Sequence, residues 1–154
     1  MSYPSSKYFS PHELIQPSLF EHLTECALMK IIGTYNLSCL DMLRIEYEQA
    51  VRLSGRYKEK ADCYIYINGN YCGQEFKYSG LRAIDAPYAE NSPHKNGNTF
   101  DLKCRHMSIL LNLIIENSMT YSIDRIENPE LTVFRGWIHC EFSAYAKQLK
   151  IFNP

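Results

Sequence analysis

The sequence lacks the features that mark several common classes of protein. Its 154 residues carry a formal net charge of −1 and no concentrated stretch of lysine and arginine, so it offers no electrostatic footprint for nucleic acid. Its longest apolar run, Ile109–Ile115, is too short to span a bilayer. The first residues contain no apolar segment of the secretory type. We therefore expect a protein that is cytoplasmic as made, with no nucleic acid and no membrane span.

Paired cysteine motifs are also missing. The six cysteines stand at positions 26, 39, 63, 72, 104 and 140, and none belongs to a Cys-x-x-Cys pair. Without a secretory signal, this pattern indicates free thiols in a reducing compartment. A disulfide framework is the alternative interpretation.

The composition that is present suits a folded domain. Hydrophobic residues make up 45% of the chain and charged residues 21%, which is enough apolar surface for a core. The length predicts one domain over residues 1–154, and we expect a monomer. The twelve tyrosines suit either a half-wet cleft or a tyrosine-rich strand surface, because the ring can be buried while the hydroxyl finds a partner.

Hydrophobic periodicity predicts a mixture of helices and strands, and hence an α+β domain. The predicted helices cover Leu19–Ile32, Cys39–Leu53 and Met107–Asn117, with Gly33 ending the first. The predicted strands cover Asp62–Ile67, Thr99–Cys104, Ser122–Ile126 and Trp137–Phe142. Residues 144–154 are expected to be a short helix or a tail, and the polar stretch Glu75–Asn98 a long loop of the kind that often carries function.

Two of the predicted strands place polar side chains on one face. Side chains alternate along a strand, so Asp101 lies opposite the apolar face of Thr99–Cys104, and His139 lies opposite the apolar face of Trp137–Phe142. If these strands are neighbours, both side chains face one cleft, which His94 can close from the loop just upstream. Two histidines and one carboxylate are a donor set that catalytic zinc uses. A hydrogen-bonded surface histidine and an ordinary solvated carboxylate are the competing interpretations.

Several segments resemble the zinc D-alanyl-D-alanine carboxypeptidases, peptidoglycan peptidases that share their fold with the Hedgehog signalling domain. Ser79–Arg82 resembles the family's Ser-Gly-Tyr-Arg segment. Ser92–His94, with Asp101 seven residues after the histidine, resembles its Ser-x-His-x-x-Gly-x-Ala-x-Asp motif. Trp137–His139 resembles the segment that carries the last ligand, and Tyr8–Leu14 resembles the Phe-Ser-x-x-Glu-Leu opening of small phage-encoded members.

The resemblance implies a fold, a reaction and roles for single residues. The fold would be α+β, with an antiparallel sheet and helices packed on one side. His94, Asp101 and His139 would bind Zn²⁺ for hydrolysis of a peptide bond in bacterial peptidoglycan, of the D-Ala-D-Ala carboxypeptidase or cross-link endopeptidase type. Arg82 would hold the substrate through its fork of donors, and Ser92 would bind the peptide. The protein would then be phage-encoded and would act on the cell wall of the host. A surface ion pair with Asp85 or Glu90 is the alternative for Arg82.

The sequence departs from the family pattern at two places. Thr99 stands where the motif has its small alanine. Gly136 occupies the position, three residues before the last histidine, where many members carry an acidic general base. A catalytic carboxylate must then come from Glu141, on the His139 face, or from Glu130 or Glu127. Without one, the chain would be a non-catalytic zinc-binding, peptidoglycan-binding or structural module, and a metal-free interaction protein is a third reading.

Overall fold

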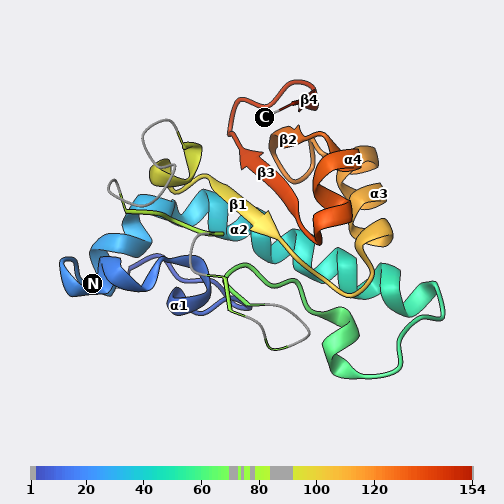
Figure 1. Ribbon diagram of the computed structural model, residues 1–154, viewed down its shortest axis with the longest axis horizontal. Coiled ribbons are helices and arrows are strands. Elements are labelled where there is room, and N and C mark those ends of the chain that lie inside the picture. The colour runs from blue at the N-terminus through green and yellow to red at the C-terminus, as the bar shows by residue number, and fades with distance from the viewer. Residues whose placement is uncertain (1–2, 70–72, 74, 77–78, 84–91, 154) are drawn as a thin grey trace.

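The computed structural model describes residues 3–69, 73, 75, 76, 79–83 and 92–153, which form an α+β fold (Figure 1). The α-helices are α1 (Pro11–Leu14), α2 (Glu25–Leu53), α3 (Met107–Asn117) and α4 (Pro129–Thr132). The 3-10 helices are η1 (Pro17–Glu21), η2 (Lys60–Cys63), η3 (Pro93–Asn96) and η4 (Val133–Arg135). The strands are β1 (Thr99–Leu102), β2 (Ile123–Glu127), β3 (Ile138–Phe142) and β4 (Lys150–Phe152).

The four strands form one mixed sheet in the order β1-β3-β2-β4. β3 pairs antiparallel with both β1 and β2, as expected, but β4 pairs parallel with β2. The expectation of a purely antiparallel sheet was therefore wrong, as was the short helix or tail expected for residues 144–154. β4 spans only three residues, of which Lys150 and Ile151 are exposed, so it carries too little alternation to be recognised from sequence.

The long helix α2 changes direction at Gly33. This residue has φ 80° and ψ 153°, a conformation outside the helical region that glycine adopts without steric cost. The prediction that a helix ends at Gly33 is confirmed in that sense, although a second helical stretch follows directly. The first stretch begins at Glu25, where the Thr24 hydroxyl caps it by accepting a hydrogen bond from the backbone N–H of Ala27.

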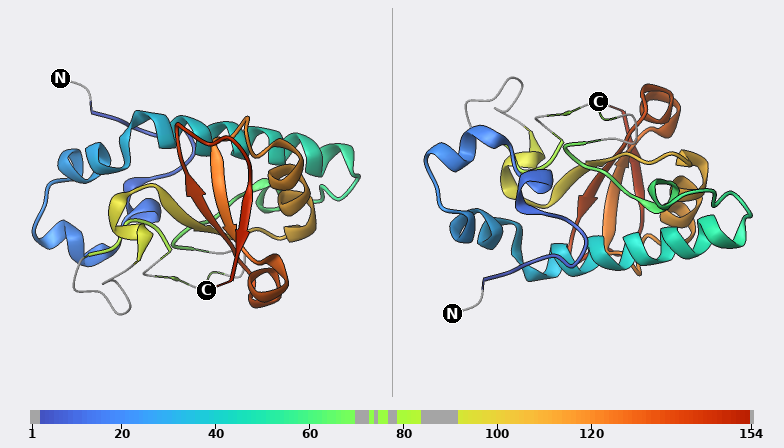
Figure 2. Two further views of the ribbon diagram at one scale, coloured as in Figure 1. Left: turned by 90° about the horizontal axis from the view of Figure 1, so that it is seen from above. Right: turned by 90° about the horizontal axis from the view of Figure 1, so that it is seen from below.

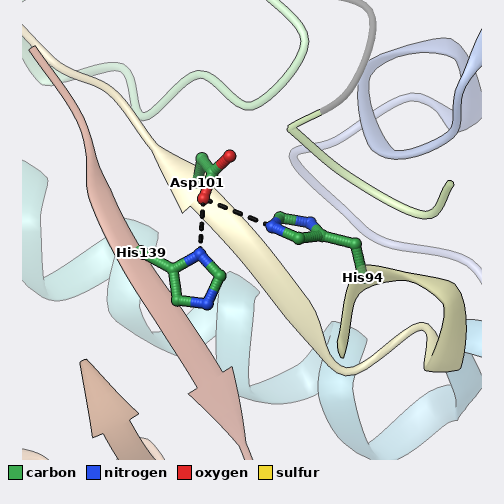
Figure 3. A group of neighbouring side chains, drawn as sticks. All are labelled: His94, Asp101 and His139. Atoms are coloured by element: carbon green, nitrogen blue, oxygen red, sulfur yellow. Dashed lines mark hydrogen bonds and ion pairs between the residues drawn. The ribbon is translucent and has the colours of Figure 1, made fainter. Parts of the chain in front are cut away.

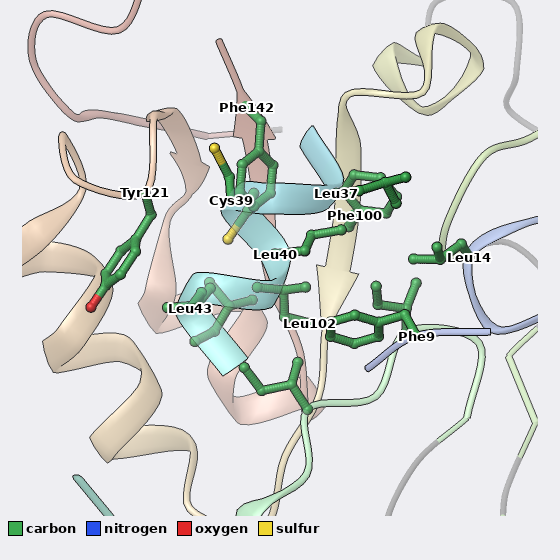
Figure 4. Packing of buried hydrophobic residues seen from close by; sticks show 14 of the residues in the cluster. Phe9, Leu14, Leu37, Cys39, Leu40, Leu43, Phe100, Leu102, Tyr121 and Phe142 are labelled. Carbon is green, nitrogen blue, oxygen red and sulfur yellow. The ribbon is translucent and has the colours of Figure 1, made fainter. Parts of the chain in front are cut away.

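The core lies between α2 and one face of the sheet. In Figure 4, leucines of α2 point toward Phe100 and Leu102 of β1 and toward Phe142 of β3. Burial of each such side chain stabilises the fold by about 1.5–3 kcal/mol. Ile138, Cys140 and Phe142 are all buried, as the alternation along this strand predicted. Figure 2 shows α2 lying across the strands of the sheet. Asp101 and His139 alternate with the buried apolar residues of β1 and β3 and therefore lie on the opposite face.

The segment Asp62–Ile67 does not form the strand expected from its alternation. Its first residues belong to η2, because the buried Asp62 carboxylate accepts hydrogen bonds from the backbone N–H groups of Lys58 and Glu59. Only Tyr66 pairs in a strand-like manner, in an isolated antiparallel bridge with Lys103. Local side-chain hydrogen bonding thus overrides the period of two.

None of the helices that the structure describes combines the length and apolarity needed to cross a membrane. The five described cysteines (Cys26, Cys39, Cys63, Cys104 and Cys140) are free thiols, and Cys72 lies outside the described residues.

A close backbone contact fixes the segment that precedes the candidate site. The N–H of Leu81 donates to Leu14 O at 2.8 Å, and the N–H of Gln16 donates to Leu81 O at 2.8 Å. Gly80 stands where these two segments meet, and a Cβ atom added to it would lie 1.9 Å from Leu14 O. A side chain at position 80 is therefore incompatible with the contact.

Replacing Gly80 by alanine should lower the free energy of unfolding by about 2–3 kcal/mol, because the backbone of Leu14 must move to admit the methyl group. Gly136→Ala is the matched control: its φ of 94° is unfavourable for alanine, but a Cβ there meets nothing within 4 Å. We expect a cost of about 1–2 kcal/mol for the control. Urea unfolding measures both values, and equal costs would contradict the close contact at Gly80.

Candidate metal centre

The side chains of His94, Asp101 and His139 converge on one point (Figure 3). Asp101 Oδ1 lies 2.8 Å from His139 Nδ1 and 3.4 Å from His94 Nε2. The two imidazole rings are 5.0 Å apart between centroids. One candidate ligand atom from each residue lies within 4.8 Å of the other two. The three residues therefore form one compact group, which we call the triad.

The register of β1 and β3 brings two members of the triad together. Asp101 is directly paired with His139 across the antiparallel ladder, so their side chains emerge side by side on the same face. Figure 3 shows both side chains in front of the strands, with helical segments behind. The sequence prediction that these strands are neighbours with both residues on one face is confirmed.

The third member comes from η3, whose position depends on a glycine. Gly97 ends η3 in the left-handed region, with φ 72°, and a Cβ there would lie 2.9 Å from the carbonyl oxygen of Ile31. The side chain of Asn36 donates to Gly97 O and to Ile32 O, which ties the turn to α2. η3 therefore packs against α2 beside the bend at Gly33, and His94 is carried toward β1.

The two ring nitrogens of His94 have different surroundings. Nδ1 lies 3.1 Å from the carbonyl oxygen of Gly80, an acceptor only, so Nδ1 carries the proton in this contact. Nε2 then presents its lone pair toward Asp101 Oδ1. This is the usual arrangement of a ligand histidine, whose second nitrogen donates to a carbonyl that fixes the tautomer and the ring orientation. Gly80 thus has a role in the site that sequence reasoning missed.

His139 is held from both sides. Its Nδ1 faces Asp101, whereas Nε2 is buried, forms no hydrogen bond and lies 3.7 Å from Glu141 Oε1. Glu141 Oε2 in turn accepts a hydrogen bond from Arg125 at 3.3 Å. The ring of Phe152 in β4 closes the outer side, 5.8 Å from the His139 ring between centroids.

The charges of the triad are unequal in the metal-free state. Burial lowers the pKa of His94, and Asp101 offsets only part of this effect. Burial also lowers the pKa of His139, but Asp101 and Glu141 outweigh it and raise that pKa to about 9. Burial would raise the pKa of Asp101, yet the two imidazoles hold it well below its usual range. At neutral pH the group therefore contains a carboxylate, a neutral His94 and a cationic His139.

Such a group can hold a metal ion. It supplies two imidazole nitrogens and one carboxylate oxygen, and the residues beside it orient both rings. His139 must lose its proton before Nδ1 can bind a metal, so metal and proton compete for the same lone pair.

The structure places the other predicted site residues at different distances from the triad. Arg82 lies beside it, with one terminal nitrogen 3.6 Å from Asp101 Oδ2. Ser92 is buried at the start of η3. Glu127 ends β2, and Glu130 is exposed in the first turn of α4, whereas the carboxylate that contacts the triad is that of Glu141. The substrate-binding and catalytic roles of these residues remain predictions. Residues 85 and 90, the alternative partners of Arg82, lie outside the described residues.

A buried lysine links the triad to the segment that carries Arg82. Lys103 is 2% exposed and donates to Ser79 Oγ at 2.6 Å and to the carbonyl oxygens of Ile67 and Asp101. Burial lowers its pKa to about 8, despite the opposing effect of Asp101. Alternation along the strand puts Lys103 on the same face as Asp101. Its hydrogen-bond partners Ser79 and Ile67 belong to distant segments, and no sequence pattern predicts these contacts.

No protein-family model matches this chain, and comparison with the curated proteins and with the solved structures finds no match. The assignment of the site therefore rests on its geometry and on the resemblance of its motifs.

The raised pKa of His139 predicts that zinc binding depends on pH. At pH 7, well below the pKa of about 9, His139 is protonated, so zinc binding should release about one proton per chain. The affinity should rise by about tenfold per pH unit and level off near pH 9. Titration calorimetry in buffers of different ionisation enthalpy measures the number of protons.

The control for this titration is Glu141→Gln. It removes one of the two carboxylates that raise the pKa of His139, so fewer protons should be released at pH 7. Zinc binding without proton release in the unaltered protein would show that His139 is not a ligand.

Proposed function

We propose that this protein is a zinc-dependent hydrolase of a peptide bond in bacterial peptidoglycan, of the D-Ala-D-Ala carboxypeptidase or cross-link endopeptidase type. The observation that carries the proposal is the convergence of His94, Asp101 and His139 through the pairing of β1 with β3. The order and spacing of these residues resemble the ligand motifs of the zinc D-alanyl-D-alanine carboxypeptidases. The Hedgehog-like fold of that family is part of the proposal.

The donor set fits zinc better than it fits magnesium or calcium. Imidazole nitrogen suits zinc, whereas magnesium and calcium prefer sets made of oxygen alone. A zinc ion with three protein ligands keeps a position for water, lowers the pKa of that water and polarises the substrate carbonyl. The chain's own contribution is orientation: Gly80 O fixes His94, and Glu141 stands behind His139.

Arg82 is the residue that we propose to hold the substrate. Its guanidinium stands next to Asp101 Oδ2, the oxygen that does not face the imidazoles. A planar fork of donors at this edge of the triad suits a terminal carboxylate or a developing oxyanion. Lys103 supports that placement, because it binds Ser79 at the start of the Ser79–Arg82 segment.

Glu141 has two possible roles, and its contacts favour one of them. Oε1 faces Nε2, the nitrogen of His139 that points away from Asp101, and Oε2 is held by Arg125. In this position Glu141 stabilises the tautomer in which Nδ1 is available to a metal. Proton transfer from a metal-bound water would require its side chain to turn toward the Nδ1 side of the ring.

A non-catalytic peptidoglycan-binding module is the second candidate, and Gly136 is the observation that favours it. Gly136 ends η4 in the left-handed region, with φ 94°. Glutamate or aspartate, the general base of many family members, would strain the backbone at this position. The backbone conformation at position 136 therefore disfavours an acidic side chain there. This favours a protein that binds peptidoglycan without cleaving it.

Two measurements separate these functions. Mass spectrometry of the native protein tests for one zinc per chain, and incubation with purified muropeptides tests for a released D-alanine or a cleaved cross-link. We expect zinc and cleavage in the unaltered protein, and neither in His139→Ala. His22→Ala, which removes an exposed histidine outside the triad, is the matched control and should retain both.

The outcomes have distinct meanings. Zinc binding without cleavage of either intact or soluble peptidoglycan would reject the enzyme. Binding of cell wall by that inert protein would then select the module. A chain that binds no zinc would reject the enzyme, since the triad would then be an ordinary hydrogen-bonded group, and binding of cell wall by that chain would still select the module.

Glu141→Gln tests the role of Glu141. If it orients His139, the zinc affinity should fall by about 10–100-fold, because the amide holds the imidazole less strongly than the carboxylate does. We expect this result, measured by competition with a chelating dye at about pH 9, where protons no longer compete strongly with zinc for His139. An unchanged zinc affinity with turnover reduced by about 10²–10⁴-fold would instead identify Glu141 as the general base.

A further inference from the structure

A cavity of about 1050 Å³ lies outside the triad. Its described walls come from the N-terminal segment, α1, the C-terminal half of α2, residues between Tyr57 and Gly69, and Gly73, Glu75 and Phe76. None of these lining residues belongs to the triad. This volume is at the upper end of the range found for small-molecule sites. Four of the lining side chains are tyrosines: Tyr8, Tyr57, Tyr64 and Tyr66.

Arg44 is the charged group buried in this cavity. It projects from α2, and only 4% of its surface is exposed. Its guanidinium carbon lies 4.9 Å from the centre of the Tyr64 ring and 5.6 Å from that of Tyr8, so aromatic rings flank the charge. A buried guanidinium is costly unless its charge and its five donors are satisfied.

The protein satisfies Arg44 only weakly. Among the described residues, its ion pair is with Glu48, at 3.4 Å, a long contact for a charge-assisted hydrogen bond. Glu48 is also shared with Arg52, which binds it more closely through two donors at 2.8 and 3.0 Å. One carboxylate thus serves two guanidinium groups, and the buried one has the poorer geometry.

The balance of charge around the cavity favours an anion. Lys7, Arg52 and Lys60 line it together with Arg44, against the acidic residues Glu13, Glu48 and Glu75. Burial raises the pKa of Glu13 to about 7, so this carboxyl carries less negative charge at neutral pH than an exposed glutamate. Among the described lining residues, positive charge therefore predominates.

We propose that this cavity binds a small organic anion in which a carboxylate or phosphate is attached to an aromatic or sugar ring. The anionic group pairs with the guanidinium of Arg44, which can bind two oxygens at once. The ring contacts Tyr64 and Tyr57, which stand on the cavity wall. Aromatic, sugar-acid and sugar-phosphate ligands share this chemistry. The inference is independent of the metal centre and of the proposed hydrolysis.

The test is calorimetric titration of the full chain, treated with chelator, with three ring anions: 4-hydroxybenzoate, glucuronate and glucose 6-phosphate. We expect at least one to bind at least tenfold more tightly than its neutral counterpart, 4-hydroxybenzamide or glucose, and more tightly than acetate or inorganic phosphate. The probe that binds shows whether the ligand is an aromatic acid, a sugar acid or a sugar phosphate. Absence of binding by all three, or equal binding of the neutral counterparts, would overturn the proposal.

Two variants with opposite expected effects sharpen the test. Arg44→Met keeps the apolar stem and removes the charge, and should weaken binding by at least tenfold. Glu48→Gln removes the carboxylate that competes for Arg44, and should tighten binding severalfold. Arg135→Gln, an exposed change on η4, is the control for the loss of a positive charge and should have no effect.

Two other variants can test the proposal if Arg44→Met does not fold. Glu48→Gln and Tyr57→Ala, both at partly exposed positions, then carry the test, with tighter and weaker binding expected respectively. Unchanged binding in both, or in a folded Arg44→Met, would overturn the proposal. His139→Ala should bind the ring anion as the unaltered protein does, which distinguishes this site from the triad.

Discussion

The antiparallel pairing of β1 with β3 sets Asp101 directly opposite His139, and the candidate metal centre depends on this register. A shift of one residue would move either side chain to the apolar face, where α2 packs. The same pairing buries Phe100 and Cys140 on that face, so the core and the triad are fixed together. His94 joins them only because η3 packs closely against α2 through Gly97.

Much of this arrangement was predictable from the sequence, because it follows from local alternation. A period of two is enough to separate Asp101 and His139 from the apolar sides of their strands, and the structure confirms both assignments. The helix Met107–Asn117 has the predicted bounds, since its apolar spacing is regular. The place of His94 beside them was expected from its loop just upstream of the strand and from motif resemblance, and not from periodicity.

The remainder depends on contacts between distant segments, which single-sequence patterns do not encode. The parallel pairing of β4 with β2 involves three residues. His94 contacts the carbonyl oxygen of Gly80. Gly80 in turn packs against the backbone of Leu14, which occupies the space that a side chain at position 80 would need. The tyrosine content suggested either a half-wet cleft or a strand surface, and four tyrosines line the cavity around Arg44.

X-ray absorption at the zinc edge tests most directly whether one metal ion binds to His94, Asp101 and His139. The protein has six cysteines, so sulfur is the competing donor. We expect nitrogen and oxygen scatterers at about 2.0–2.1 Å, with the multiple-scattering pattern of two imidazoles and no sulfur. A shell at about 2.3 Å from zinc-bound thiolates, or a spectrum unchanged in Asp101→Asn, would contradict this expectation.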